Sequence, residues 1–192
     1  PVLLSASRAN LVALGAMLLV WSLIQPQVGF SLKRFALPAT GGVVALFFLD
    51  QILARFQGDS GERGHFMEVA LEQLARTPWF GVGPGAYVPV VGRFDSLTAQ
   101  GWPVHNIFVL QAVELGIIGA ALFFLPFLTV IVRAMARLRA SGEVGSFARA
   151  VIAYVPALGA IGWTGWGWLA PDVLFLACFV FAFASTRPTA PR

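Results

Sequence analysis

Residues 61–116 read GERGHFMEVALEQLARTPWFGVGPGAYVPVVGRFDSLTAQGWPVHNIFVLQAVELG. The stretch begins as a charged, Gly-rich island and changes at Trp102-Pro103-Val104-His105-Asn106 into a long apolar run. Apolar sequence of membrane length also precedes the island. This alternation predicts membrane-spanning helices that carry one large loop outside the membrane, and the candidate functional residues gather in that loop.

The composition of the whole chain is also that of a membrane protein. Of its 192 residues, 58% are hydrophobic and 11% are charged, and the mean hydropathy is +0.79. Soluble domains usually carry about 25% charged residues. Because a helical span needs about 20 residues, the chain has room for about five spans and one loop. We therefore expect an all-α integral membrane protein whose large extracytoplasmic loop contains an amphipathic helix.

The apolar runs predict spans at about residues 9–28, 35–54, 107–132, 150–166 and 171–186 of a single membrane domain, 1–192. Lys33 and Arg34 lie between the first two spans, and basic residues from Arg133 to Arg149 follow the third. Because basic residues favour the cytoplasmic side, both of these loops are assigned to the cytoplasm and the loop 55–106 to the outside. Pro126 is the only interruption expected in the third span.

The start of the chain indicates a portion of a longer protein. The first residue is Pro1 rather than Met, and apolar sequence of membrane length follows almost at once. We expect further N-terminal transmembrane helices to be needed for function. The single cysteine, Cys178, excludes a disulfide within the chain.

The first part of the island predicts an amphipathic helix that ends before Pro78. Arg63, Met67, Ala70 and Leu74 recur at helical spacing and share one face. This face is long enough to lie on the membrane surface or on top of the helix bundle. Arg63 is then expected on the packed side, where its charge needs a partner, and an arginine that reaches lipid phosphates is the alternative.

Gly81-Val82-Gly83-Pro84-Gly85 follows this helix and predicts a tight irregular loop packed against it. A nucleotide-binding loop is not indicated. No Lys-Ser or Lys-Thr pair follows the glycines, and the surrounding sequence does not alternate strands with helices.

His105 and Asn106 stand where the loop enters the third span. A histidine at this place either makes a polar contact at the helix start or acts on a substrate that is reached from outside. Asn106 can cap the helix without help from another side chain. Glu114 is expected on the opposite helix face from His105, as a structural partner of another helix rather than a group that orients His105.

Taken in this order, the elements resemble the O-antigen ligase family of bacterial membrane glycosyltransferases, which includes O-antigen polymerases and protein O-oligosaccharyltransferases. The resemblance covers about residues 5–119. Its matching residues are Ser7-Arg8, Arg63 before Met67-Glu68-Val69-Ala70-Leu71, Thr77 to Gly85, His105-Asn106, and Glu114-Leu115-Gly116. Met67 departs from the family, which often carries Trp there, and the chain has fewer spans than family members.

The resemblance implies transfer of a glycan from an undecaprenyl-diphosphate carrier to a lipid A-core, a growing polysaccharide or a protein. The reaction would take place at the periplasmic face of the bacterial inner membrane, with no metal, no cofactor and no nucleic acid. Membrane lipids, the lipid-linked donor and the glycan, lipid or protein acceptor are the partners that it implies.

Site residues carried over from the resemblance are His105, Arg63 and Arg8 as catalytic, and Arg63, Arg8 and Asn106 as substrate-binding. Arg76 and Arg93 are added as substrate-binding candidates because of their charge in the same loop. His105 would position or deprotonate the attacking hydroxyl, and the arginines would hold the departing diphosphate. Two roles are open for Arg76 and Arg93: they widen the basic surface toward the diphosphate, or they merely pair with Glu72 and Asp95. The other histidine, His65, has no counterpart in the resemblance.

A non-catalytic membrane subunit or a transporter fragment is the alternative function, in which the island only caps the helix bundle. Transporters usually show inverted repeats and charges inside their spans. This sequence shows no such repeat, and Glu114 is the only charge well inside a predicted span. The enzyme is therefore the leading hypothesis.

Overall fold

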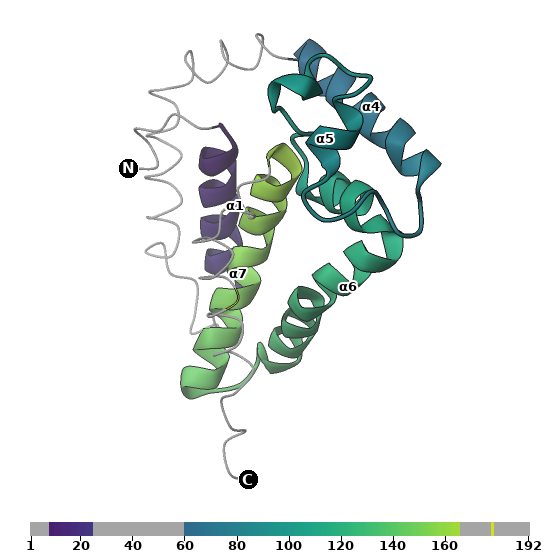
Figure 1. Cartoon of the computed structure of the whole chain (residues 1–192). Coiled ribbons are helices and arrows are strands. Elements are labelled where there is room, and N and C mark those ends of the chain that lie inside the picture. The colour runs from purple at the N-terminus through teal and green to yellow at the C-terminus, as the bar shows by residue number, and fades with distance from the viewer. Residues whose placement is uncertain (1–7, 25–59, 166–177, 179–192) are drawn as a thin grey trace. The chain divides into compact units, whose positions relative to one another are not determined.

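The fold is that of a computed structural model, which describes residues 8–24, 60–165 and 178. Its helices are α1 (Arg8–Ile24), α4 (Ser60–Arg76), α5 (Tyr87–Val91), the 3-10 helix η1 (Thr98–Gln100), α6 (Ile107–Arg137) and α7 (Gly142–Thr164) (Figure 1). They belong to two compact units. One unit includes residues 8–24 and 127–161, and the other includes residues 60–126 and 162–165.

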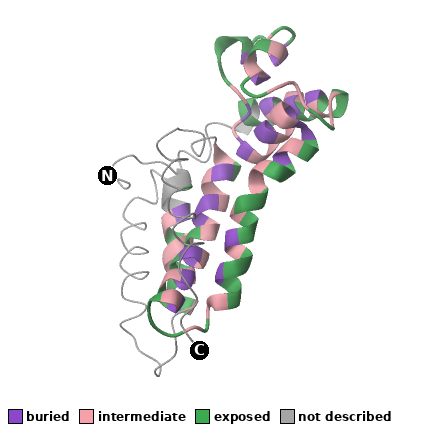
Figure 2. Cartoon of the chain, turned by 60° about the horizontal axis from the view of Figure 1, so that its bottom comes forward, coloured by how far each residue is buried: buried purple, intermediate pink, exposed green. Residues whose placement is uncertain are grey.

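The described residues contain helices and loops and no strand, which confirms the all-α class for this part of the chain. Helices α6 and α7 are long and apolar enough to cross a membrane, and α1 contributes a shorter apolar helix in the first predicted span. Only 11% of the most apolar window of α6 is buried, and exposed residues follow much of its length (Figure 2). The predicted span 35–54, and all of the span 171–186 except residue 178, lie outside the described residues, so the number of about five spans stays a prediction.

The predicted amphipathic helix is α4, and it ends at Arg76, just before Pro78. Phe66 and Ala70 on its inner face are buried in the core of their unit. The remaining buried members of this core come from α5 and from the entry to α6: Tyr87, Val91, Val104, Leu110 and Val113. The apolar face of α4 thus packs on α5 and the first turns of α6.

Helix α6 is broken at Gly116, where the sequence predicts no interruption. The backbone there has φ 70° and ψ 173°, a region that essentially only glycine adopts. At Pro126, the one interruption that we expect, the helix continues. The expectation that only Pro126 interrupts this span is therefore wrong. The break at Gly116 is caused by the Gly-rich loop that precedes α5.

The Gly-rich loop makes main-chain hydrogen bonds to the groups that the break leaves without helical partners. The N–H groups of Val82 and Gly83 donate to the carbonyl oxygens of Val113 (2.9 Å) and Glu114 (2.8 Å). Ile117 N–H, just beyond the break, donates to the Pro78 carbonyl at 2.8 Å. Because buried main-chain groups need partners, the loop stabilises the broken helix and the break holds the loop in place.

In the other unit, Arg149 of α7 caps the end of α6. Arg149 is 6% exposed, and its guanidinium donates to the Leu138 carbonyl at 3.1 Å and to Ser146 Oγ at 3.2 Å. A cation at a helix C-terminus also interacts favourably with the helix dipole. Arg149, which the sequence analysis uses only as a mark of the cytoplasmic side, therefore has a structural role.

Candidate functional site

A pocket with a volume of about 240 Å³ opens between α4 and the segment that leads into α6. Seven residues line it: Glu62, Arg63, Phe66, Leu97, Gln100, Trp102 and His105. The first three come from α4 and the other four come from residues 97–105. Both walls belong to the same compact unit, so one folded body forms the whole pocket.

Arg63 reaches this pocket from the packed side of α4. It lies three residues before Phe66 and seven before Ala70, and this spacing places all three on one helix face. Phe66 and Ala70 are buried, whereas Arg63 is exposed at the end of the face and lines the pocket. The predicted position of Arg63 on the packed side is confirmed.

His105 lies next to two aromatic rings. The ring centroid of Phe66 is 5.9 Å from that of His105, with 43° between the ring planes. Trp102 stacks on His105 with a centroid distance of 6.4 Å and an interplanar angle of 18°. An aromatic contact from each wall of the pocket therefore restrains the imidazole.

Asn106 caps α6. Its side-chain oxygen accepts hydrogen bonds from the N–H groups of Phe108 (3.0 Å) and Val109 (3.2 Å), as an N-cap residue does. Asn106 is 1% exposed and does not line the pocket. The predicted cap is confirmed, and by fixing the start of α6 it also fixes the main chain of its neighbour His105.

Glu114 is a structural partner, as the sequence analysis predicts. Its carboxylate accepts a hydrogen bond from Tyr87 N–H at 3.3 Å, at the start of α5. A carboxylate at this place satisfies a main-chain donor of the short helix. Glu114 does not line the pocket.

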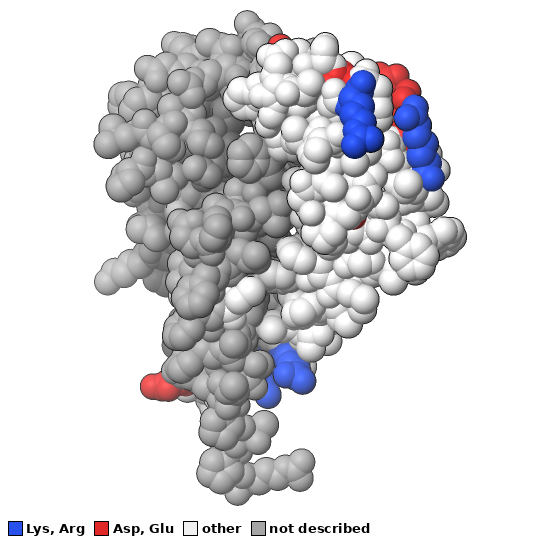
Figure 3. Space-filling view, in the orientation of Figure 1, with Lys and Arg blue, Asp and Glu red and all other residues white. Residues whose placement is uncertain are grey.

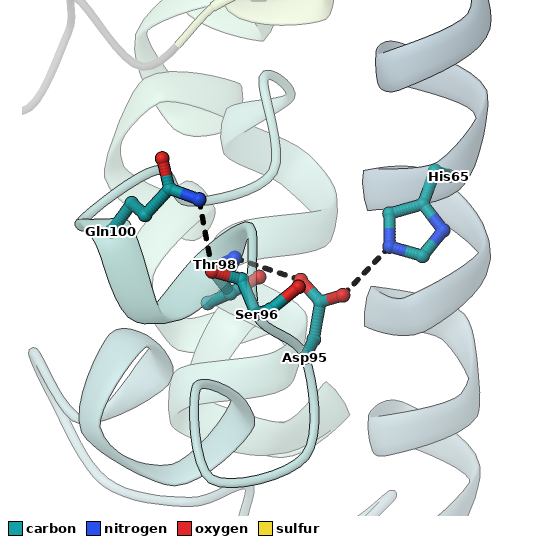
Figure 4. A network of polar contacts seen from close by, with 5 residues as sticks. All are labelled: His65, Asp95, Ser96, Thr98 and Gln100. Carbon is teal, nitrogen blue, oxygen red and sulfur yellow. Dashed lines mark hydrogen bonds and ion pairs between the residues drawn. The ribbon is translucent and has the colours of Figure 1, made fainter.

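Asp95 and His65 join the two walls of the pocket (Figure 4). Asp95 Oδ1 lies 2.7 Å from His65 Nε2 on α4, and Asp95 Oδ2 accepts a hydrogen bond from Thr98 N–H at 2.8 Å. The first contact ties the segment 95–100 to α4, and the second stabilises the start of η1. Asp95 thus pairs with His65 and Thr98 rather than with Arg93, which does not support the pairing role left open for Arg93.

Asp95 ionises more easily than an ordinary aspartic acid. Burial opposes its ionisation, but hydrogen bonds from Thr98 and His65 outweigh burial and hold the pKa of Asp95 below its usual range. The pKa of buried Tyr87 is raised to about 12, by burial first and then by the charge of Asp95. Asp95 therefore carries a full negative charge inside this unit at neutral pH.

The sequence model of the O-antigen ligase family matches residues 2–124, which is more than half of the chain. The chain belongs to the O-antigen ligase family. The match includes both walls of the pocket, the Gly-rich loop and the break in α6, and it confirms the resemblance drawn from the motifs. No curated protein matches the chain in a sequence search.

Membership in the O-antigen ligase family places the chain among membrane proteins of glycosyltransferase-like chemistry that act in polysaccharide biosynthesis. Among the described residues, no group of three or more His, Cys, Asp or Glu side chains is placed to hold a metal ion. The residues that line the pocket offer positive charge from Arg63, an imidazole from His105, and aromatic and polar contacts from the other side chains.

Of the predicted site residues, Arg63 and His105 line the pocket, whereas Asn106, Arg76 and Arg93 do not. Arg8 begins α1 in the other compact unit, and its side chain lies outside the described residues. Arg76 Nη2 lies 3.8 Å from Glu72 Oε2, so the expected pairing of Arg76 with Glu72 is confirmed. Arg76 Cζ also lies 5.0 Å from the ring centroid of Phe94. Arg93 is exposed on the turn after α5.

The surface of this unit mixes the two signs of charge. In Figure 3, acidic side chains lie beside the basic ones at the upper right of the molecule. A mixed surface is typical of solvated helix faces and does not by itself attract a diphosphate. Together with the contact between Arg76 and Glu72, the mixed charge on this face favours the pairing interpretation of Arg76 over a widened basic surface.

The sequence analysis assigns no role to Glu62, Gln100, Trp102 or His65. Glu62 stands beside Arg63, and Trp102 lies within the quoted junction before His105, so proximity in sequence was the only signal available for them. Gln100 lines the pocket, and His65 contacts Asp95, only after the segment 95–100 has folded against α4, which no local pattern encodes.

Proposed function

We propose that the chain is the catalytic portion of an enzyme that transfers a glycan from an undecaprenyl-diphosphate carrier. The acceptor is a lipid A-core, a growing polysaccharide or a protein, and the site faces the periplasm from a multi-pass protein of the bacterial inner membrane. One observation carries the proposal: Arg63 and His105, far apart in the sequence, line the same pocket.

In the proposed reaction, an acceptor hydroxyl attacks the anomeric carbon of the first sugar of the carrier. The bond from this carbon to the diphosphate oxygen breaks as the new glycosidic bond forms, and undecaprenyl diphosphate leaves. His105 takes the hydroxyl proton, the role that a positioned imidazole most often has in general acid–base catalysis. Arg63 binds the diphosphate with two parallel donors as it departs.

Positive charge from arginine makes the proposed transfer independent of a metal. Charge that develops on the diphosphate is stabilised most strongly where donors are fixed in place before the reaction. Arg8 is proposed to add a second guanidinium, while Arg93 and Arg76 are proposed to act only on the approach of the donor. Membrane lipids and further N-terminal transmembrane helices are proposed to complete the surroundings of the site.

The test is glycan transfer by the full-length protein reconstituted in membranes, with His105→Ala beside the wild type. We expect a loss of about 10²-fold or more in turnover, the usual scale for a lost acid–base group. Binding of the lipid-linked donor and expression are expected to stay close to wild type, because the cap at Asn106 and the core are intact. Wild-type turnover in His105→Ala would contradict the role of His105.

His65→Ala is the matched histidine control. His65 and His105 flank the same Phe66 ring, with centroid distances of 6.1 Å and 5.9 Å. Because His65 contacts Asp95 and does not line the pocket, its loss is expected to lower thermal stability while the turnover of folded protein changes far less than in His105→Ala. An equal loss of turnover in the two variants, at equal stability, would remove the distinction between them.

A further inference from the structure

Trp102 is half exposed although it belongs to a packed pocket. Its relative exposure is 52%, while one side of its indole ring stacks on His105. An aromatic face exposed to water is unfavourable, because the transfer of apolar surface out of water lowers the free energy. A ring that is held in place and yet open to a pocket is therefore a surface that a ligand can cover.

The main chain around Trp102 restricts where this ring can lie. Gly101, just before Trp102, ends η1 in the left-handed conformation, with φ 97°, and Pro103 comes just after Trp102. Glycine reaches this conformation without strain, and proline has a fixed φ. Asp95 holds η1 itself through Thr98, so the turn that presents Trp102 is anchored at its base.

The groups beside Trp102 are polar and suited to hydroxyls. Gln100 donates from Nε2 to the Ser96 carbonyl at 3.3 Å, and its side-chain oxygen points away from that contact (Figure 4). Glu62 lines the opposite wall. An amide oxygen and a carboxylate are hydrogen-bond acceptors, and sugar hydroxyls are donors. The volume of about 240 Å³ equals that of about eight liquid water molecules, which admits a small polar ring.

We propose that Trp102 is the stacking platform for a sugar ring of the transferred or the accepting glycan, and that Glu62 and Gln100 bind hydroxyls of that ring. The apolar C–H face of the sugar covers the indole, and its hydroxyl edge turns to the two acceptors. This assignment deepens the proposed function, on which it rests, by adding residues that select the sugar. It also places the sugar beside Arg63 and His105.

Exposed aromatic residues can instead serve as membrane anchors, and Trp79 separates the two explanations. Trp79 lies in the same compact unit and is 60% exposed, but it does not line the pocket. If exposed tryptophans act only as anchors at the membrane interface, Trp79→Ala and Trp102→Ala should change KM to a similar extent. A sugar platform predicts an effect for Trp102→Ala alone.

The experiment measures KM and kcat of the reconstituted full-length protein, separately for the lipid-linked donor and for the acceptor. Trp102→Ala is expected to raise KM about tenfold or more for one of the two glycans, and Trp102→Phe to restore most of the affinity. The glycan whose KM rises is the one that stacks on Trp102. KM values within twofold of wild type for both substrates, or an equal rise in Trp79→Ala, would overturn the proposal.

Two further measurements keep the proposal testable in case Trp102→Ala does not fold or transfer fails. Glu62→Gln and Gln100→Ala leave the aromatic contacts in place and are each expected to raise the same KM by about threefold or more. Quenching of tryptophan fluorescence by a panel of soluble oligosaccharides reports binding without any transfer. Saturable quenching whose amplitude falls in Trp102→Phe, which lacks the indole that reports binding, would support the platform even if the protein transfers no glycan. Absence of quenching across the panel would overturn the platform while leaving the transfer reaction itself standing.

Discussion

His65 Nε2 on α4 lies 2.7 Å from Asp95 Oδ1, in the segment that leads to η1. This contact joins two parts of the chain that each contribute one wall of the pocket. Asp95 is 7% exposed, so its charge depends on the partners that surround it. The geometry of the pocket is therefore coupled to one ionised carboxylate.

Asp95→Asn is expected to destabilise the full-length protein by about 1–3 kcal/mol at pH 7, the usual cost of disturbing a buried charged hydrogen bond. The folded-state pKa of Asp95 is lowered, so its stabilisation is complete above the unfolded value of about 3.9 and is lost as the pH falls through the folded value. The gap in melting temperature between wild type and Asp95→Asn should thus close in acid. Thermal unfolding in detergent at pH 7, 5, 3.5 and 2.5 measures it, because the loss begins only below the unfolded value.

Glu68→Gln is the control for this measurement, because Glu68 is an exposed carboxylate on the same helix. Surface charges usually change stability by less than about 1 kcal/mol. Two outcomes would contradict the structural role of Asp95. In one, Asp95→Asn lowers the melting temperature at pH 7 no more than Glu68→Gln does; in the other, the difference in melting temperature between wild type and Asp95→Asn widens in acid.

The second prediction concerns the break in α6. A Cβ at Gly116 would overlap the main chain of Trp79 and Phe80, and the same residue has φ 70°. Gly116→Ala is therefore expected to combine backbone strain of about 1–3 kcal/mol with a clash that displaces the Gly-rich loop. A large fall in thermal stability and in transfer should follow, measured on purified protein in detergent.

Two other glycines divide this effect into its parts. Gly85 has φ 68° and open space around a Cβ, so Gly85→Ala should show the backbone strain alone. Gly64 lies within α4, also in open space, and Gly64→Ala should be neutral or stabilise by up to about 1 kcal/mol. If Gly116→Ala is no less stable than Gly85→Ala, the close packing of loop and helix is wrong.

Features set by neighbouring residues were predictable from the sequence. The spacing of apolar residues gives α4, Pro78 marks its end, and Asn106 is the N-cap of α6. The position of Arg63 follows from the same helical period. Each of these features depends on contacts within a few turns of chain, which is the range over which residue patterns carry information.

Features that depend on distant contacts were not predictable. A glycine inside an apolar run is tolerated in many helices, so Gly116 gave no signal of a break. The break depends on donors from Val82 and Gly83, which meet α6 only after the chain has folded back. In the same way Arg93, two residues from Asp95, was the obvious ion partner in sequence, and His65 is the partner in space.

The third prediction is topological: the loop 55–106 faces the periplasm. Ser96 is exposed in this loop, and Ser141 is exposed between α6 and α7, among the basic residues assigned to the cytoplasm. In a variant without other cysteines, Ser96→Cys in intact cells with a permeable outer membrane should react with an impermeant maleimide, and Ser141→Cys should react only after lysis. The reverse pattern would invert the orientation and with it the proposed side of the reaction.

The last prediction tests how Arg63 recognises its anion. Arg63→Lys keeps the positive charge but loses the planar pair of donors that fits a phosphate group. If Arg63 holds the departing diphosphate, the Lys variant should lose about tenfold or more in kcat, because the lost interaction is strongest as the charge develops. Binding of anionic lipid should change little, since charge alone supports it.

Arg133→Lys is the matched control for this measurement. Arg133 is exposed on α6, among the basic residues assigned to the cytoplasm, and does not line the pocket. Its replacement by Lys is expected to leave transfer within about twofold of wild type, as an exposed charge-conserving change usually does. Full activity in Arg63→Lys would favour an arginine that reaches lipid phosphates, because that role needs only a charge on a long side chain. A loss confined to Arg63→Lys would favour the two-donor contact to diphosphate, and a matching loss in Arg133→Lys would show that the exchange acts through the membrane and not through the pocket.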